Sequence, residues 1–119
     1  MFAFSTGQIS GTLLNLSSIR VDLMNKSKGA PKVRVLIFDT SKSPKATVFD
    51  QTFTIEPYSG DFRTISPENF PDHFEVVVRS NEQNIVPNVS LFTMVPVMMI
   101  PYGDLFIWEP DPDSDPLES

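Results

Sequence analysis

Hydrophobic and polar residues alternate along most of this chain. Ile19, Val21 and Leu23, for example, alternate with Arg20, Asp22 and Met24, of which two are charged. A period of two residues places alternate side chains on opposite faces of an extended strand, so this pattern predicts a strand with one buried face. Residues 32–38 are apolar on most of both faces. That pattern is typical of a central strand, or of a strand that is covered on its second side.

Further segments of the same kind follow at short intervals, with polar turns between them. The predicted strands lie at residues 19–24, 32–38, 47–55, 61–65, 73–79, 89–91, 95–102 and 105–108. Gly and Pro recur in the intervening turns, where their special backbone preferences are useful. The neighbouring apolar residues Leu91 and Phe92 interrupt the alternation, which predicts a bulge or a change of face at that point.

Seven or eight short strands joined by polar turns predict an all-β domain over residues 12–108. The expected architecture is an antiparallel β-sandwich of the immunoglobulin-like or jelly-roll type. A small barrel uses the same strand pattern and stays open as an alternative. No segment keeps the period of an amphipathic helix, and without a crossover helix a parallel sheet is disfavoured.

The two ends of the chain differ from this body. Residues 1–11 carry Phe2, Phe4 and Ile9 between small residues, and we interpret them as an extended apolar arm. Such an arm either pairs with its own sheet as a first strand or adds to the sheet edge of a neighbouring copy. Residues 109–119 are rich in Asp and Pro, and they predict a disordered acidic tail because they hold too little apolar surface to fold.

The composition is that of one small globular domain. The chain has 119 residues, ten of them Phe, and it has no Cys, which excludes disulfides and thiolate chemistry. The formal net charge is −6, but five of the fifteen acids lie in the last eleven residues, which leaves ten acids against nine bases elsewhere. A nearly neutral body argues against nucleic acid as a partner.

Targeting signals are also absent from the pattern. The first residues contain neither a basic segment nor a long apolar one, so we expect synthesis in the cytoplasm without a signal peptide. No apolar run reaches the ~18 residues that a membrane-spanning helix needs, so we expect no membrane insertion.

Little in the sequence could carry catalysis. His73 is the single histidine, and no serine stands in the Gly-x-Ser-x-Gly context of a hydrolase nucleophile. Asp111, Asp113 and Asp115 have the spacing that opens a calcium loop, but Pro112 and the missing glycine do not suit one. We therefore expect no enzymatic activity, no catalytic residues, no cofactor and no metal site.

The remaining candidates are apolar. Residues 95–108 combine Met, Phe and Trp, which adapt well to the surfaces of partners. This segment is either a last core strand or a contact surface. Together with the arm it gives these candidate interface residues: Phe2, Phe4, Ile9, Met98, Met99, Phe106 and Trp108.

Four stretches carry a family resemblance, namely residues 14–23, 33–39, 51–60 and 73–79. In their pattern of strands and turns they resemble small β-sandwich proteins of spore-forming Bacillota, and more loosely the subunits of spore-surface layers and appendages. The resemblance implies a structural role at the spore surface, with an N-terminal arm that joins neighbouring subunits. Such subunits often add cysteine crosslinks, which this chain cannot form.

Two functional hypotheses follow. In the first, the chain is a non-enzymatic structural subunit that forms homo-oligomers through its arm, with other surface proteins as further partners. In the alternative, it is a monomeric immunoglobulin-like module that recognises protein or glycan through its loops. Tyr58, Tyr102 and Trp108 are the aromatic candidates for that second function.

Overall fold

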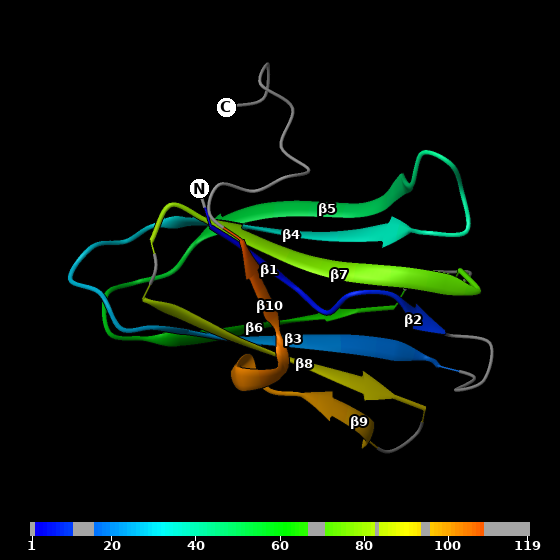
Figure 1. Ribbon diagram of the computed structural model, residues 1–119. Helices are drawn as coiled ribbons and strands as arrows, with labels where there is room; N and C mark the ends of the chain where they lie inside the picture. Colours follow the sequence, from blue (N-terminus) through cyan, green and yellow to red (C-terminus); the bar gives the residue numbers. More distant parts are fainter. Residues whose placement is uncertain (1, 11–15, 67–70, 83, 94–95, 109–119) are drawn as a thin grey trace.

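Two antiparallel β-sheets face each other and enclose one hydrophobic core (Figure 1). The computed structural model describes residues 2–10, 16–66, 71–82, 84–93 and 96–108. Within these residues the regular structure is all-β apart from one short 3₁₀ turn, η1 (Tyr102–Asp104). The alternation in the sequence therefore predicts the fold class correctly, and two separate sheets make it a β-sandwich. The described residues form no helix that is long and apolar enough to cross a membrane.

The sheets are built from strands that lie far apart in the sequence. The first sheet contains β1 (Phe2–Ser5), β2 (Ile9–Ser10), β4 (Lys32–Asp39), β5 (Ala46–Thr54), β7 (His73–Ser80) and β10 (Phe106–Trp108). Its order is β10-β1-β7-β4-β5, and β2 pairs with β7 as a continuation of β1. The second sheet contains β3 (Ser18–Asn25), β6 (Gly60–Ile65), β8 (Ile85–Phe92) and β9 (Pro96–Ile100), in the order β6-β3-β8-β9.

The described residues form ten strands, where the sequence pattern predicts seven or eight. The two additional strands, β1 and β2, arise from the segment that the sequence suggests as an arm. Strand β8 also starts at Ile85, earlier than predicted, although it contains Pro87. Proline has no N–H for a sheet ladder. Strand β8 can contain Pro87 because β9 pairs with β8 only from Val89 onward. On the side that faces β9, Pro87 therefore has no partner among the described strands.

Two finer predictions are confirmed. Strand β4 is central, since it lies between β7 and β5, and its outward side chains Leu36 and Phe38 are buried. The register between β8 and β9 shifts between Leu91 and Phe92, which is the irregularity that the interrupted alternation predicts.

The core lies between the inward faces of the two sheets. Its side chains include Ile19, Val21, Val35, Ile37, Phe74, Val76 and Leu91, all almost completely buried. Among the described strands, β4–β5 and β8–β9 are the hairpins, and the other connections from β2 onward pass from one sheet to the other. Because the chain crosses between the layers so often, most of the core depends on contacts between residues that are distant in sequence.

The N-terminal segment is part of this core. Strand β1 lies between β7 and β10, with Phe4 aligned with Val78 on one side and with Ile107 on the other. The side chain of Phe4 is 1% exposed and that of Ile9 is 8% exposed. Of the two arrangements that the sequence leaves open for the arm, the structure has the first, in which it pairs with its own sheet. Residues 109–119, which predict an acidic tail, lie outside the described residues.

A buried amide joins the loops at one end of the sandwich. The Asn25 side chain is fully buried, and its Nδ2 donates to the carbonyl oxygens of Gly29, Ile55 and Glu56 at 2.9, 3.2 and 3.0 Å. Its Oδ1 accepts from the backbone N–H of Ser27 at 2.9 Å. Because a buried polar group is costly when it lacks partners, this set of bonds fixes the 26–31 loop against the 55–59 turn.

The burial of Phe4 predicts that the N-terminal segment is needed for stability. Phe4→Ala removes a ring from a closed core, and we expect the free energy of unfolding to fall by about 3–5 kcal/mol. Chemical denaturation measures it, with Phe106→Ala as the control, since Phe106 is 59% exposed. Equal losses for the two variants would show that residues 2–10 are not docked in the core.

The amide of Asn25 predicts a second, local weakness. In Asn25→Asp the carboxylate faces three carbonyl oxygens and donates nothing to them, so we expect a loss of about 3 kcal/mol in unfolding free energy at neutral pH. Asn81→Asp is the matched control, because Asn81 is exposed. Thermal unfolding at pH 7 checks this, and an unchanged melting temperature for Asn25→Asp would contradict it.

Candidate interaction surface

Exposed apolar side chains gather on the last two strands of the sandwich. In β9, Met98 and Met99 are 42% and 65% exposed, and in β10, Phe106, Ile107 and Trp108 are 59%, 47% and 49% exposed. Scattered apolar residues are normal on a protein surface. Five within two consecutive strands are a local concentration of the kind that contact surfaces often contain. We call these five residues the C-terminal edge.

The fold places both strands of the C-terminal edge on the same side of the molecule. Strand β9 is the outer strand of one sheet and β10 the outer strand of the other. The chain passes between them through η1, shown in orange in Figure 1. Tyr102 anchors this crossing: its ring lies 5.9 Å from that of Phe4, and its N–H donates to Asn88 Oδ1 at 2.9 Å. Leu105 is buried beside it.

Directly paired residues on neighbouring strands point to the same face of a sheet. Trp108 is paired with Ala3, and Phe106 with Ser5, so these two rings lie on the outer face. Ile107 is paired with Phe4 and lies on the core side. The edge therefore offers apolar groups on both faces of one strand.

Strand β10 also has a free backbone edge. It pairs with β1, and no strand among the described residues pairs with its other side. An unpaired edge carries backbone donors and acceptors that can extend a sheet into a second chain. Proteins protect such edges with short strands, charges or prolines. Strand β10 is short, but its three residues are Phe, Ile and Trp, with no charge among them.

The seven sequence candidates divide into two groups. Met98, Met99, Phe106 and Trp108 lie in the C-terminal edge. Phe4 and Ile9 are buried in the core of their own chain, and Phe2 packs partly buried against that core. Phe4 and Ile9 are therefore not exposed for docking in the folded chain, and Phe2 is only partly exposed, because all three pack in their own sandwich. Ile107 completes the edge, although the sequence candidates do not include it.

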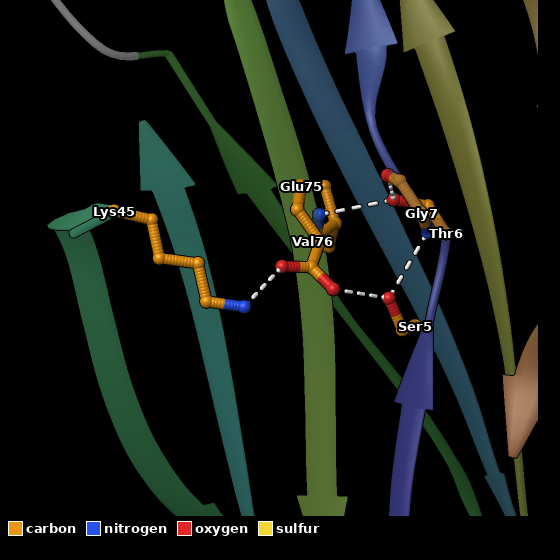
Figure 2. A network of polar contacts seen from close by, with 6 residues as sticks. All are labelled: Ser5, Thr6, Gly7, Lys45, Glu75 and Val76. Atoms are coloured by element: carbon orange, nitrogen blue, oxygen red, sulfur yellow. Dashed lines mark hydrogen bonds and ion pairs between the residues drawn. The ribbon is translucent and has the colours of Figure 1, made fainter. Parts of the chain in front are cut away.

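A polar network holds the N-terminal segment where β1 ends and β2 has not yet begun (Figure 2). Glu75 on β7 lies at its centre: Lys45 Nζ donates to Glu75 Oε1 at 2.7 Å, and the Ser5 hydroxyl donates to Oε2. The Gly7 N–H donates in turn to Ser5 Oγ at 3.0 Å. The network thus connects β1, β7 and the loop before β5.

Between β1 and β2, where the regular pairing with β7 is interrupted, Thr6 forms two hydrogen bonds to β7. Its N–H donates to the Val76 carbonyl at 3.1 Å, and its Oγ1 accepts the Val76 N–H at 3.1 Å. Gly7 follows with a positive φ of 70°. A Cβ atom at Gly7 would lie 3.3 Å from Cε2 of Phe106, closer than a relaxed contact. Glycine is therefore needed at this bend for two reasons: it adopts a positive φ easily, and it leaves room for the ring of Phe106.

Ser5, Lys45 and Glu75 form a chain of hydrogen bonds between strands. The Ser5 hydroxyl gives its hydrogen to the carboxylate of Glu75, which also accepts from the Lys45 ammonium. His73 lies on the same strand, but its Nδ1 is buried without a hydrogen-bond partner. In the described part of the chain, no three His, Asp or Glu side chains are placed to hold a metal ion.

The outer face of the same sheet carries a second charged pair. Arg34 donates to both carboxylate oxygens of Asp50, at 2.8 and 2.6 Å. These bonds hold the pKa of Asp50 below its usual range, and the nearby charge of Arg79 acts in the same direction against the effect of burial. Arg79 itself is 4% exposed. Paired charges thus cover this part of the outer face, whereas the C-terminal edge exposes apolar side chains.

The aromatic residues of the loop-binding hypothesis do not act as one set. Tyr102 packs against Phe4 in the core, and Trp108 lies on a strand. Tyr58 alone is an exposed loop residue, 65% exposed in the turn between β5 and β6.

Comparison with known proteins gives no match: no family model, no curated protein and no solved structure matches this chain.

The polar network predicts that Glu75 fastens the N-terminal segment. Glu75→Gln keeps the shape but removes the charge that Lys45 and Ser5 bond to, so we expect a loss of about 1–2 kcal/mol in unfolding free energy. Amide hydrogen exchange should become faster at Thr6 and Gly7 in particular. Glu56→Gln, at an exposed position, is the control. Protection at Thr6 and Gly7 that is the same in both variants would count against the role of the network.

Proposed function

We propose that this protein is a non-enzymatic structural subunit that self-associates through its C-terminal edge. The observation that carries the proposal is the position of Phe106, Ile107 and Trp108 on a strand with a free backbone edge. A few buried anchor residues, Trp often among them, supply most of the binding energy in protein contacts. Backbone pairing along the same strand would fix the orientation of the two partners.

The partner is a second copy of the same chain. An edge strand can pair with itself antiparallel around a two-fold axis, so that each copy offers the same surface to the other. In such a dimer β10 of one copy continues the first sheet into the next, with Ile107 near the axis. The methionines of β9 then lie beside the contact and can adapt to it.

This proposal changes the part of the chain that makes the contact. In the first hypothesis from the sequence the arm docks onto a neighbour, whereas in the structure residues 2–10 belong to their own sheet, in which β1 pairs with β10. The arm contributes indirectly, through Gly7 under Phe106 and through the pairing of β1 with β10. A place in a spore-surface layer, which the family resemblance implies, fits a self-associating subunit and is part of the proposal.

The proposal predicts concentration-dependent oligomers that need the C-terminal edge. We expect light scattering after size exclusion to give multiples of the 13.3 kDa chain mass. Charged edges resist pairing, so Phe106→Lys combined with Trp108→Lys should weaken association by about 100-fold or more.

Val48→Lys is the matched control, because Val48 is 45% exposed on β5, the opposite edge of the same sheet. It should leave the oligomer intact, and circular dichroism should show both proteins folded. A wild-type protein that remains a 13.3 kDa particle at high concentration would sink the proposal. So would an oligomer that only Val48→Lys disrupts.

A further inference from the structure

The outer face of the second sheet contains a hollow that the proposed contact does not use. It measures about 360 Å³ and is lined by Asp22, Leu23, Met24, Gly60, Asp61, Phe62, Val86 and Asn88. These residues come from β6, β3 and β8, three neighbouring strands in the order of the sheet. The hollow arises where Gly60, which has no side chain, pairs with Met24.

The apolar part of the hollow is well exposed. Met24 and Phe62 are 45% and 52% exposed, and Val86 is paired with Met24 on the far side. Phe62 offers an aromatic ring, with the Arg20 guanidinium carbon 4.2 Å from its centroid. A ring held in this way is a flat apolar platform on an otherwise polar sheet face.

The carboxylate that faces the hollow is neutralised by a neighbour, since Asp22 accepts from Arg20 at 3.0 Å. Asp61 is aligned with the buried Leu23, so its side chain points to the other face of the sheet, where it pairs with Arg63 at 2.9 Å. A cationic ligand would have to displace Arg20 from Asp22, and an anionic ligand would meet the carboxylate of Asp22. The site therefore suits a neutral ligand that hydrogen-bonds to charged groups without replacing them.

The polar groups also have bonding capacity left. The Asn88 side chain uses its Oδ1 for the Tyr102 N–H, and its amide nitrogen carries two further donors. The carboxylate of Asp22 can accept more bonds than Arg20 supplies. Donors and acceptors thus surround an apolar platform within one small hollow.

We propose that this hollow binds a neutral saccharide. A sugar ring has C–H groups that pack on an aromatic or thioether surface and hydroxyls around its rim that both donate and accept hydrogen bonds. That combination matches Phe62 and Met24 next to Asp22 and Asn88. A volume of about 360 Å³ is at the small end of ligand pockets, and the open sheet face lets a longer glycan continue beyond it.

The proposal is independent of self-association and is tested on the wild-type chain and on the Phe106→Lys, Trp108→Lys variant. Saturation-transfer NMR with cellohexaose, chitohexaose, xylohexaose and mannohexaose should show transfer to at least one of them. We expect dissociation constants on the order of 1 mM or tighter. Phe62→Ala should weaken binding roughly tenfold or more, as expected for a lost anchor.

Gly60→Val provides a second variant that does not remove a contact. A Cβ at Gly60 would lie 3.6 Å from the Leu23 carbonyl oxygen, an ordinary contact distance. The variant should therefore fold, fill the hollow and abolish binding, while Phe106→Ala on the other sheet leaves binding unchanged.

No transfer from any of the four sugars at about 10 mM overturns the proposal, and so does binding that Gly60→Val does not affect. Binding of a neutral oligothreonine peptide without any sugar binding also overturns it, because the hollow would then be a polypeptide site.

Discussion

Strand β1 is inserted between β7 and β10, and the rest of the surface depends on this insertion. The pairing aligns Phe4 with Val78 and with Ile107, so one residue joins the centre of the first sheet to its outer strand. Phe4 also contacts the ring of Tyr102, which holds the crossing from β9 to β10. Without β1, β10 has no partner strand among the described residues. The buried ring of one N-terminal residue thus positions an exposed surface more than a hundred residues later in the chain.

The two-residue alternation of hydrophobic and polar positions predicts most of the strands, because the pattern of a strand depends only on residues that are close in sequence. It locates eight strands, the central position of β4 and the irregularity at Leu91. It does not distinguish an arm from an inserted strand, since short alternation next to Gly7 is compatible with both. The alternation also does not predict the early start of β8. Pro87 argues against a strand unless it is known that β9 pairs with β8 only from Val89 onward. Each failure concerns which segments become neighbours, and that depends on tertiary contacts.

The same division holds for the candidate surfaces. The composition of residues 95–108 indicates Met98, Met99, Phe106 and Trp108, and these side chains are exposed. Phe4 has the same apolar character and is buried, because exposure depends on what covers a residue. The network of Ser5, Lys45 and Glu75 joins residues 70 and 30 positions apart, which no spacing rule reveals. The hollow depends on register, since it forms only where Gly60 lies beside Met24.

The pairing of β1 with β10 has a consequence for the order of folding. Ala3 and Trp108 are aligned across the two strands, which makes this one of the most distant pairings in the chain. Closing a long loop is entropically costly, so such contacts form late unless the intervening structure has already brought the ends together. The exposed edge therefore comes into existence only after the sandwich behind it has folded. A growing chain on the ribosome has β1 but lacks β10, so it cannot offer the edge to another growing chain.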